Sequence, residues 1–98
     1  MEIKITHGPE MVIKFSGRLD TVSSLDLQKK IDSEEIKEDL VIFDMSETEY
    51  ISSAGLRLLI SLNKSLNNQN KKLEIRSLND VCKEVFRVTG FNNVLTVK

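Results

Sequence analysis

The stretch Val41–Leu66, VIFDMSETEYISSAGLRLLISLNKSL, decides the fold of this 98-residue chain. An apolar run ends in Asp44, a polar segment follows, and apolar residues resume just before the serines Ser52 and Ser53. Beyond the serines, leucines recur at the spacing of one helix face. This pattern predicts a strand, then a loop over residues 45–49, then a helix that begins near the two serines.

The two serines lie where this loop is expected to become the helix. A helix start presents unpaired backbone N–H groups and a partial positive charge, so a serine there can cap the helix or carry an added phosphate. Ser46 and Glu49 have the spacing of a capping box and compete for the helix start. The apolar residues just before Ser52 favour the later start.

The N-terminal segment predicts a hairpin. Polar and apolar residues alternate in Glu2–Thr6 and again in Met11–Phe15, and His7-Gly8-Pro9-Glu10 between them has the composition of a turn. Gly17 is expected to close the second strand, and Asp20 or Thr21 then caps a helix.

The remaining segments predict alternating strands and helices. Leu40–Phe43 lacks polar alternation, which is typical of a central strand covered on both faces by helices. The acidic segment 32–39 before it is expected to be a solvated connection. After it we expect the helix Leu56–Leu66, a strand at Leu73–Ile75, a helix over Leu78–Val88 with Leu78, Val81, Val85 and Val88 as its apolar stripe, a stop at Gly90 and a strand over Val94–Val97.

These elements predict one α/β domain over residues 1–98, with a mixed, mainly parallel sheet in the order β-β-α-β-α-β-α-β. Helical crossovers are right-handed and make the strands that they join parallel. A chain of this length can bury a core of its own without disulfides or metals.

Composition limits the function. The 14 basic and 15 acidic residues nearly cancel, so we expect no binding to nucleic acid or to an anionic membrane. Cys82 is the only cysteine, and its surroundings indicate a buried helix position. No stretch has the length of a signal peptide's apolar region or of a membrane span. We therefore expect a soluble, cytoplasmic protein.

The central stretch resembles a known family. Asp44-Met45-Ser46, then four residues, then Ile51-Ser52-Ser53-Ala54-Gly55-Leu56 resembles the signature of STAS domains, and more closely that of the bacterial anti-sigma factor antagonists. Phe15–Asp20 is similar to that family's second strand and following turn. The sequence departs from the commoner pattern at Ser52, where an Asp usually precedes the phosphorylated serine. STAS domains usually have one more C-terminal helix, for which this sequence stops too early.

The resemblance implies a mechanism of partner switching. It implies that Ser53 is phosphorylated by a partner kinase, with Ser52 as the second candidate. The unphosphorylated protein would bind an anti-sigma factor that is itself a serine kinase and so free the sigma factor; phosphorylation would release it, and a PP2C-type phosphatase would restore it. No cofactor is expected, because ATP belongs to the kinase. The partner-binding residues would be Asp44, Ser46, Ser52, Ala54, Gly55 and Leu56.

Two of these residues can also be interpreted without the family. Asp44 lies at the carboxyl end of the central strand, where sites gather in open α/β sheets, although a solvated acid bonded to the turn fits equally. Gly55 costs a helix about 1 kcal/mol relative to Ala, which suggests that a partner approaches its backbone closely.

The sequence argues against an enzyme. The only imidazole, His7, is expected in the first turn, and no Gly stands two residues before either serine as a nucleophile elbow requires. One His and one Cys do not make a zinc site, and no Gly-rich phosphate loop is followed by Lys. Two alternatives remain: a STAS scaffold in a stressosome-like or lipid-transport complex, and a pocket for a nucleotide or phosphorylated metabolite near Asp44 and Ser53.

Overall fold

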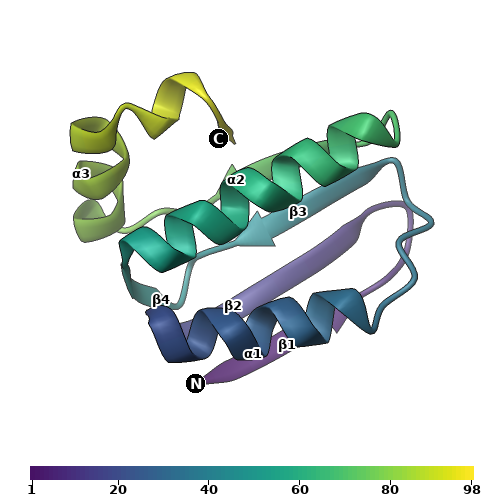
Figure 1. The fold of residues 1–98 in the computed structure, drawn as a ribbon, viewed down its shortest axis with the longest axis horizontal. Helices are drawn as coiled ribbons and strands as arrows, with labels where there is room; N and C mark the ends of the chain where they lie inside the picture. Colours follow the sequence, from purple (N-terminus) through teal and green to yellow (C-terminus); the bar gives the residue numbers. More distant parts are fainter.

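A computed structural model describes residues 1–98 as a sheet packed against helices (Figure 1). The elements are β1 (Glu2–Thr6), β2 (Met11–Leu19), α1 (Thr21–Asp32), β3 (Leu40–Asp44), β4 (Thr48–Ile51), α2 (Ser53–Asn68), β5 (Lys72–Arg76), α3 (Asp80–Thr89), the 3-10 helix η1 (Phe91–Asn93) and β6 (Thr96–Val97). The predicted α/β class and order are confirmed, with one additional strand, β4.

The strands lie in the order β1-β2-β3-β5-β6, and β4 pairs separately with β2. β1 and β2 are antiparallel, whereas every other pair is parallel. The predicted hairpin and the predicted central position of β3 are therefore confirmed. No helix of the chain is both long enough and apolar enough to span a membrane.

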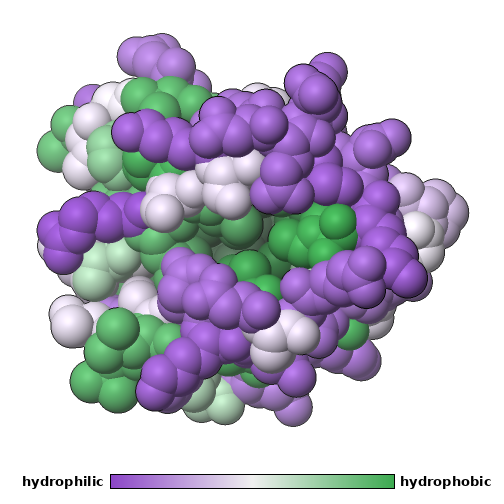
Figure 2. Space-filling view, turned by 45° about the vertical axis from the view of Figure 1, so that its right-hand side comes forward, coloured by the Kyte–Doolittle hydropathy of each residue, from purple (hydrophilic) through white to green (hydrophobic).

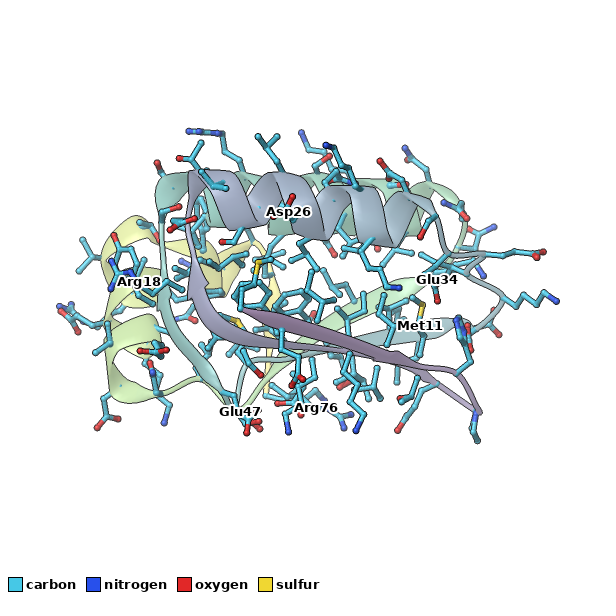
Figure 3. The ribbon with its side chains drawn as sticks, turned by 90° about the horizontal axis from the view of Figure 1, so that it is seen from below. Met11, Arg18, Asp26, Glu34, Glu47 and Arg76 are labelled. Atoms are coloured by element: carbon cyan, nitrogen blue, oxygen red, sulfur yellow. The ribbon has the colours of Figure 1, made fainter.

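The helices α1 and α2 lie side by side on one face of the sheet (Figure 1), and the other face is open. Figure 3 shows Glu47 and Arg76 on the side away from these helices. The prediction that helices cover both faces of β3 is therefore wrong. Ile42, on the open face, is only 4% exposed, and in register it is flanked by Val12 and Glu74. An apolar run can thus be buried on its second face by neighbouring strands alone.

The second strand is longer than predicted. Gly17 does not close β2; it adopts φ 108°, and the pairing register shifts between Gly17 and Arg18. The strand then continues to Leu19 and pairs in parallel with β4. The predicted loop over residues 45–49 is correspondingly wrong in its second half. Four residues show too little periodicity to predict a strand whose hydrogen-bonding partner lies far away in the chain.

Both long helices begin as the sequence indicates. Asp20 caps α1, accepting from the Ser23 N–H at 3.1 Å while the Ser23 hydroxyl accepts from the Asp20 N–H at 2.9 Å. The bond that the Ser23 N–H donates to the Asp20 carboxyl, together with the Ser23 hydroxyl 3.0 Å from Oδ1, holds the pKa of that carboxyl below its usual value. α2 extends slightly beyond the predicted leucine segment at both ends and stops before Asn70, which has a φ of 61°.

The third helix buries only part of the predicted apolar stripe: Leu78, just before the helix, is buried and Val85 packs against the core. The predicted burial of Cys82 is confirmed. Cys82 and Phe86 point into the core, whereas Val81 is 53% exposed and Val88 is 69% exposed. The prediction was wrong for Val81 and Val88, because apolar residues occur on more than one side of this helix and the packing against β4 selects the buried side. Gly90 ends α3 in the left-handed conformation, as predicted. The short helix η1 follows Gly90, and the strand predicted over Val94–Val97 is shortened to β6, Thr96–Val97.

The acidic connection before β3 is not merely solvated. Its Glu34 and Glu38 hold His7 of the β1–β2 turn: His7 Nε2 lies 3.0 Å from Glu34 Oε1, and Nδ1 lies 2.8 Å from Glu38 Oε2. Both ring nitrogens donate only in the imidazolium form. The hydrogen bonds to Glu34 and then Glu38 accordingly raise the pKa of His7. Lys71 Nζ, in the loop between α2 and β5, donates to the Glu38 carbonyl at 2.9 Å and so joins that loop to the acidic connection.

This contact predicts a pH dependence of stability. The folded protein binds the His7 proton more tightly than the unfolded chain, so the stabilisation is complete below pH 6.5 and is lost as the pH rises through the raised pKa. Urea unfolding between pH 6 and 8 should show stability falling with pH, and His7→Gln should reduce that slope. Equal slopes in both proteins would contradict the prediction. The range stays below the ionisation of Cys82, whose thiol pKa is raised by burial.

Candidate functional site

The candidate site begins where β3 ends. Asp44 Oδ1 accepts a hydrogen bond from the Ser46 N–H at 2.9 Å, and the Thr48 N–H donates to the Met45 carbonyl at 3.0 Å. These bonds turn the chain from β3 into β4. This bond agrees with the interpretation of Asp44 as an acid that is hydrogen-bonded to the turn.

β4 carries the chain from this turn to the helix start. The Ser52 N–H donates to the Leu19 carbonyl at 2.9 Å, which ties the last residue before α2 to the end of β2. Ser52 Oγ accepts from the Gly55 N–H at 3.4 Å, so Ser52 is the N-cap. The later helix start is thus confirmed, and the alternative start at Ser46 is wrong.

Ser53 is the first residue of α2, and it is exposed. The two adjacent hydroxyls therefore have different environments. The hydroxyl of Ser52 is half-buried and serves the helix as its cap, whereas that of Ser53 faces solvent and serves no cap. Replacing the hydrogen of the Ser53 hydroxyl by a larger group would leave the cap of α2 in place.

Gly55 has a packing reason inside the protein. A Cβ added there would lie 2.8 Å from Ile51 Cγ1, 2.9 Å from Leu19 Cγ and 3.0 Å from the Leu19 carbonyl oxygen. The close approach inferred from the sequence is therefore made by the chain's own β2 and β4, and a partner is not needed to explain it. Leu56 is also buried in the core. Both residues support the surface at Ser53 and Ala54 from beneath.

The charges around the site are partly compensated. Glu47 Oε2 accepts from the Ser16 hydroxyl at 2.8 Å and lies 3.6 Å from Lys14 Nζ. The guanidinium carbon of Arg18 lies 4.7 Å from the centre of the ring of Tyr50, a residue of β4. Figure 3 shows Glu47 on the open face of the sheet and Arg18 at the end of the molecule where α1 begins.

The structure does not bring Asp44 and Ser53 into one pocket. Neither residue lines any of five surface hollows of the molecule. A hollow of about 420 Å³ lies instead between the C-terminal parts of α1 and α2, with Ile31 and Leu62 among its lining residues. In Figure 2 the centre of the face is hollowed, with apolar residues at its floor and hydrophilic residues around it. The expected pocket for a nucleotide or metabolite near Asp44 and Ser53 therefore has no support in the geometry.

Asn79 is a site residue that the sequence analysis missed. Its amide Nδ2 donates to the Thr48 carbonyl at 3.0 Å, and its Oδ1 accepts from the Cys82 N–H at 2.8 Å as the cap of α3. The Thr48 hydroxyl donates to the Phe15 carbonyl at 2.8 Å. These bonds fix β4 between β2 and α3. Asn directly before a helix was a detectable capping signal, but nothing near it in the sequence indicated the bond to β4.

The chain offers little for nucleophilic or metal chemistry. His7 lies at the start of β2, at the opposite end of that strand from Leu19 and Ser52, so it cannot act as a base for either serine. No group of three His, Cys, Asp or Glu side chains is placed to hold a metal ion.

The fold and site together define a class: a small α/β domain that presents an exposed serine at the start of a helix, beside the carboxyl ends of parallel strands. The model of the STAS domain family matches residues 1–98. The chain belongs to the STAS domain family.

Curated and solved relatives agree with this assignment. The anti-sigma-B factor antagonist of Listeria monocytogenes is 25% identical over 99 residues, covering 100% of this chain and 87% of that protein. An anti-sigma factor antagonist from Mycobacterium paratuberculosis superposes with a TM-score of 0.82 at 20% identity, covering 98% of this chain and 83% of that one. The unphosphorylated form of the antagonist SpoIIAA superposes with a TM-score of 0.74 at 14% identity, covering 99% and 87%. The structural likenesses show that these proteins share the fold.

The different positions of the two serines predict different effects on stability. Ser52→Ala removes the cap and should lower the free energy of unfolding by about 0.5 to 1 kcal/mol, at the low end for caps because the bond is long. Ser53→Ala should change it by less than about 0.5 kcal/mol, because Ala is favourable in a helix. Chemical denaturation of both variants measures this. A larger loss for Ser53→Ala than for Ser52→Ala would contradict the assignment of the cap.

Gly55→Ala should destabilise the fold although Ala favours helices. The propensity gain is at most about 1 kcal/mol, whereas forcing a methyl group into a packed site typically costs about 1 to 3 kcal/mol. We expect a net loss of about 1 to 2 kcal/mol in urea unfolding. Gly8→Ala is the control, because its added Cβ meets no atom closer than the Glu10 carbonyl at 3.9 Å. A stabilised Gly55→Ala protein would show that the site has room.

Proposed function

We propose that this protein is an anti-sigma factor antagonist whose activity is switched by phosphorylation of Ser53. In the unmodified state it binds an anti-sigma factor that is a serine kinase, and the sigma factor is freed. Transfer of phosphate to Ser53 releases the kinase, and a PP2C-type phosphatase resets the protein in the cytoplasm. The protein itself is a regulatory module and not an enzyme, as the names of its curated relatives also suggest.

One observation carries the choice of Ser53. Its side chain is exposed at the first position of α2, while the adjacent Ser52 is half-buried and caps the helix. A kinase can reach the exposed Ser53 hydroxyl without disturbing the helix start, whereas the Ser52 hydroxyl is half-buried and already accepts the Gly55 N–H. SpoIIAA, which shares the fold, has been solved in unphosphorylated and phosphorylated forms. That a protein of this fold exists in a phosphorylated form supports the proposal.

The partner surface is proposed to surround this serine. Ser53 and Ala54 form its centre on the first turn of α2, and Asp44, Ser46 and Ser52 contribute from the β3–β4 turn and the cap. Gly55 and Leu56 contribute by holding the turn against the core, since both are buried. This arrangement would give a kinase a flush surface of small side chains close to the backbone.

Charge makes phosphorylation an effective release signal. A phosphate adds about 1.5 to 2 negative charges at pH 7. The segment from Asp44 to Ser53 already carries three acids and no base, although Glu47 is compensated by Lys14. A partner that fits the unmodified surface and offers no counter-charge of its own would therefore have to desolvate the added charge. An unpaired charge at an interface commonly costs a few kcal/mol.

The proposal predicts opposite outcomes for two substitutions. Ser53→Ala should bind the cognate kinase as tightly as the unmodified protein, because it adds neither bulk nor charge. Ser53→Asp should bind tenfold to a thousandfold more weakly, on the order of 1 to 4 kcal/mol, while its melting temperature stays the same or rises slightly, because an acid favours a helix N-terminus. Calorimetric titration and melting curves measure both quantities.

Ser61→Asp is the matched control, since Ser61 is an exposed serine two turns further along α2 and should tolerate the charge. Mass spectrometry after incubation with kinase and ATP should place the phosphate on Ser53. Phosphate mainly on Ser52 would overturn the assignment of the site. Unchanged binding by Ser53→Asp would refute the charge switch and favour a STAS scaffold.

A further inference from the structure

Arg57 is an unpaired cation one helical turn after Ser53. Side chains four residues apart lie on the same helix face, with Cβ atoms about 5 to 6 Å apart. Both residues are exposed. The Arg57 guanidinium takes part in none of the six ion pairs of the molecule. It is also the first base in the sequence after Asp44.

No acid on α2 competes for this cation. The helix contains no Asp or Glu anywhere between Ser53 and Asn68, so neither its dipole nor Arg57 is balanced within the helix. The elements that pack against α2 include α1, β4 and β5. Their carboxylates, Asp26, Asp32, Glu49 and Glu74, make no ion pair with Arg57.

A second arginine at this end of the molecule, Arg18, is already engaged. Arg18 belongs to β2, pairs in register with Tyr50 and lies over its ring at 4.7 Å. Arg57 is therefore the cation that is free to turn toward a group on Ser53. A guanidinium presents a planar fork of donors that matches phosphate oxygens, and such charge-assisted pairs are stronger than neutral hydrogen bonds.

From these observations we infer that Arg57 is the intramolecular counter-charge of a phosphate on Ser53. The inference rests on the proposed phosphorylation of that serine and specifies how the site is regulated. Before phosphorylation, Arg57 is a free positive charge on the partner surface. After phosphorylation the phosphate binds it across one helical turn. The switch thus withdraws a positive charge from the surface at the same time as it adds a negative one.

The test uses protein in which phosphoserine is installed at position 53 during synthesis, so that it does not depend on any kinase. Phosphorus NMR between pH 5.5 and 8 gives the second pKa of the phosphate. This pKa should be lower by about 0.3 unit or more with Arg57 than in Arg57→Gln, because a nearby cation favours the dianion. Arg57→Lys should retain part of the shift, and 1 M NaCl should diminish it.

The control is Arg18→Gln, which removes the neighbouring cation and should leave the phosphate pKa unchanged. The carboxylates of Asp20, Asp26 and Glu49 are present in every protein compared, so they do not distinguish the variants, and His7 lies at the opposite end of β2. Equal phosphate pKa values with and without Arg57 would overturn the inference. A shift that disappears in Arg18→Gln instead would assign the role to Arg18 and also overturn it.

The outcome is separable from the proposed function. If the phosphate pKa depends on Arg57 but the phosphorylated protein still binds the kinase as tightly as the unmodified one, then the pairing stands and the release mechanism fails. If release occurs with a phosphate pKa that ignores Arg57, then the switch stands and this inference fails.

Discussion

The short parallel pairing between β4 and the end of β2 holds the site in place. Gly17 shifts the register of β2, so that Arg18 and Leu19 lie beside Tyr50 and Ile51. The pairing ends with the hydrogen bond from the Ser52 N–H to the Leu19 carbonyl, one residue before α2 begins. A strand end thereby sets both the position and the direction of the helix start. Loss of this ladder would leave the exposed serine on an unanchored loop.

Neighbouring residues at the helix start divide the structural and functional roles between them. Ser52 satisfies a backbone donor, Gly55 packs against β2 and β4, and Leu56 lies in the core. Ser53 neither caps the helix nor packs in the core. A charge added to Ser53 therefore changes the surface without exposing apolar groups or breaking a cap. If Ser53 is phosphorylated as proposed, this separation would allow the domain to stay folded in both states.

Periodicity in the sequence predicted most of the framework, and the failures share a cause. The helices, the hairpin and the parallel strands emerged from local patterns of apolar residues and caps. β4, the true inner face of α3 and the open face of the sheet did not. In α3 the valines and the Cys82–Phe86 pair offer two stripes, and only packing against β4 selects between them. The role of Asn79 was missed because its partner, Thr48, is 31 residues away.

The sequence by itself determined where α2 begins and that serines stand at its start, because a cap and the first helical turn depend on residues within three or four positions of one another. Which serine is the cap and which is free was decided only by the tertiary structure. The bond from Ser52 to Leu19 and the contact of Gly55 with the same residue join segments more than 30 residues apart. Such long-range contacts leave no periodic trace in the sequence, and they determine which hydroxyl faces the solvent.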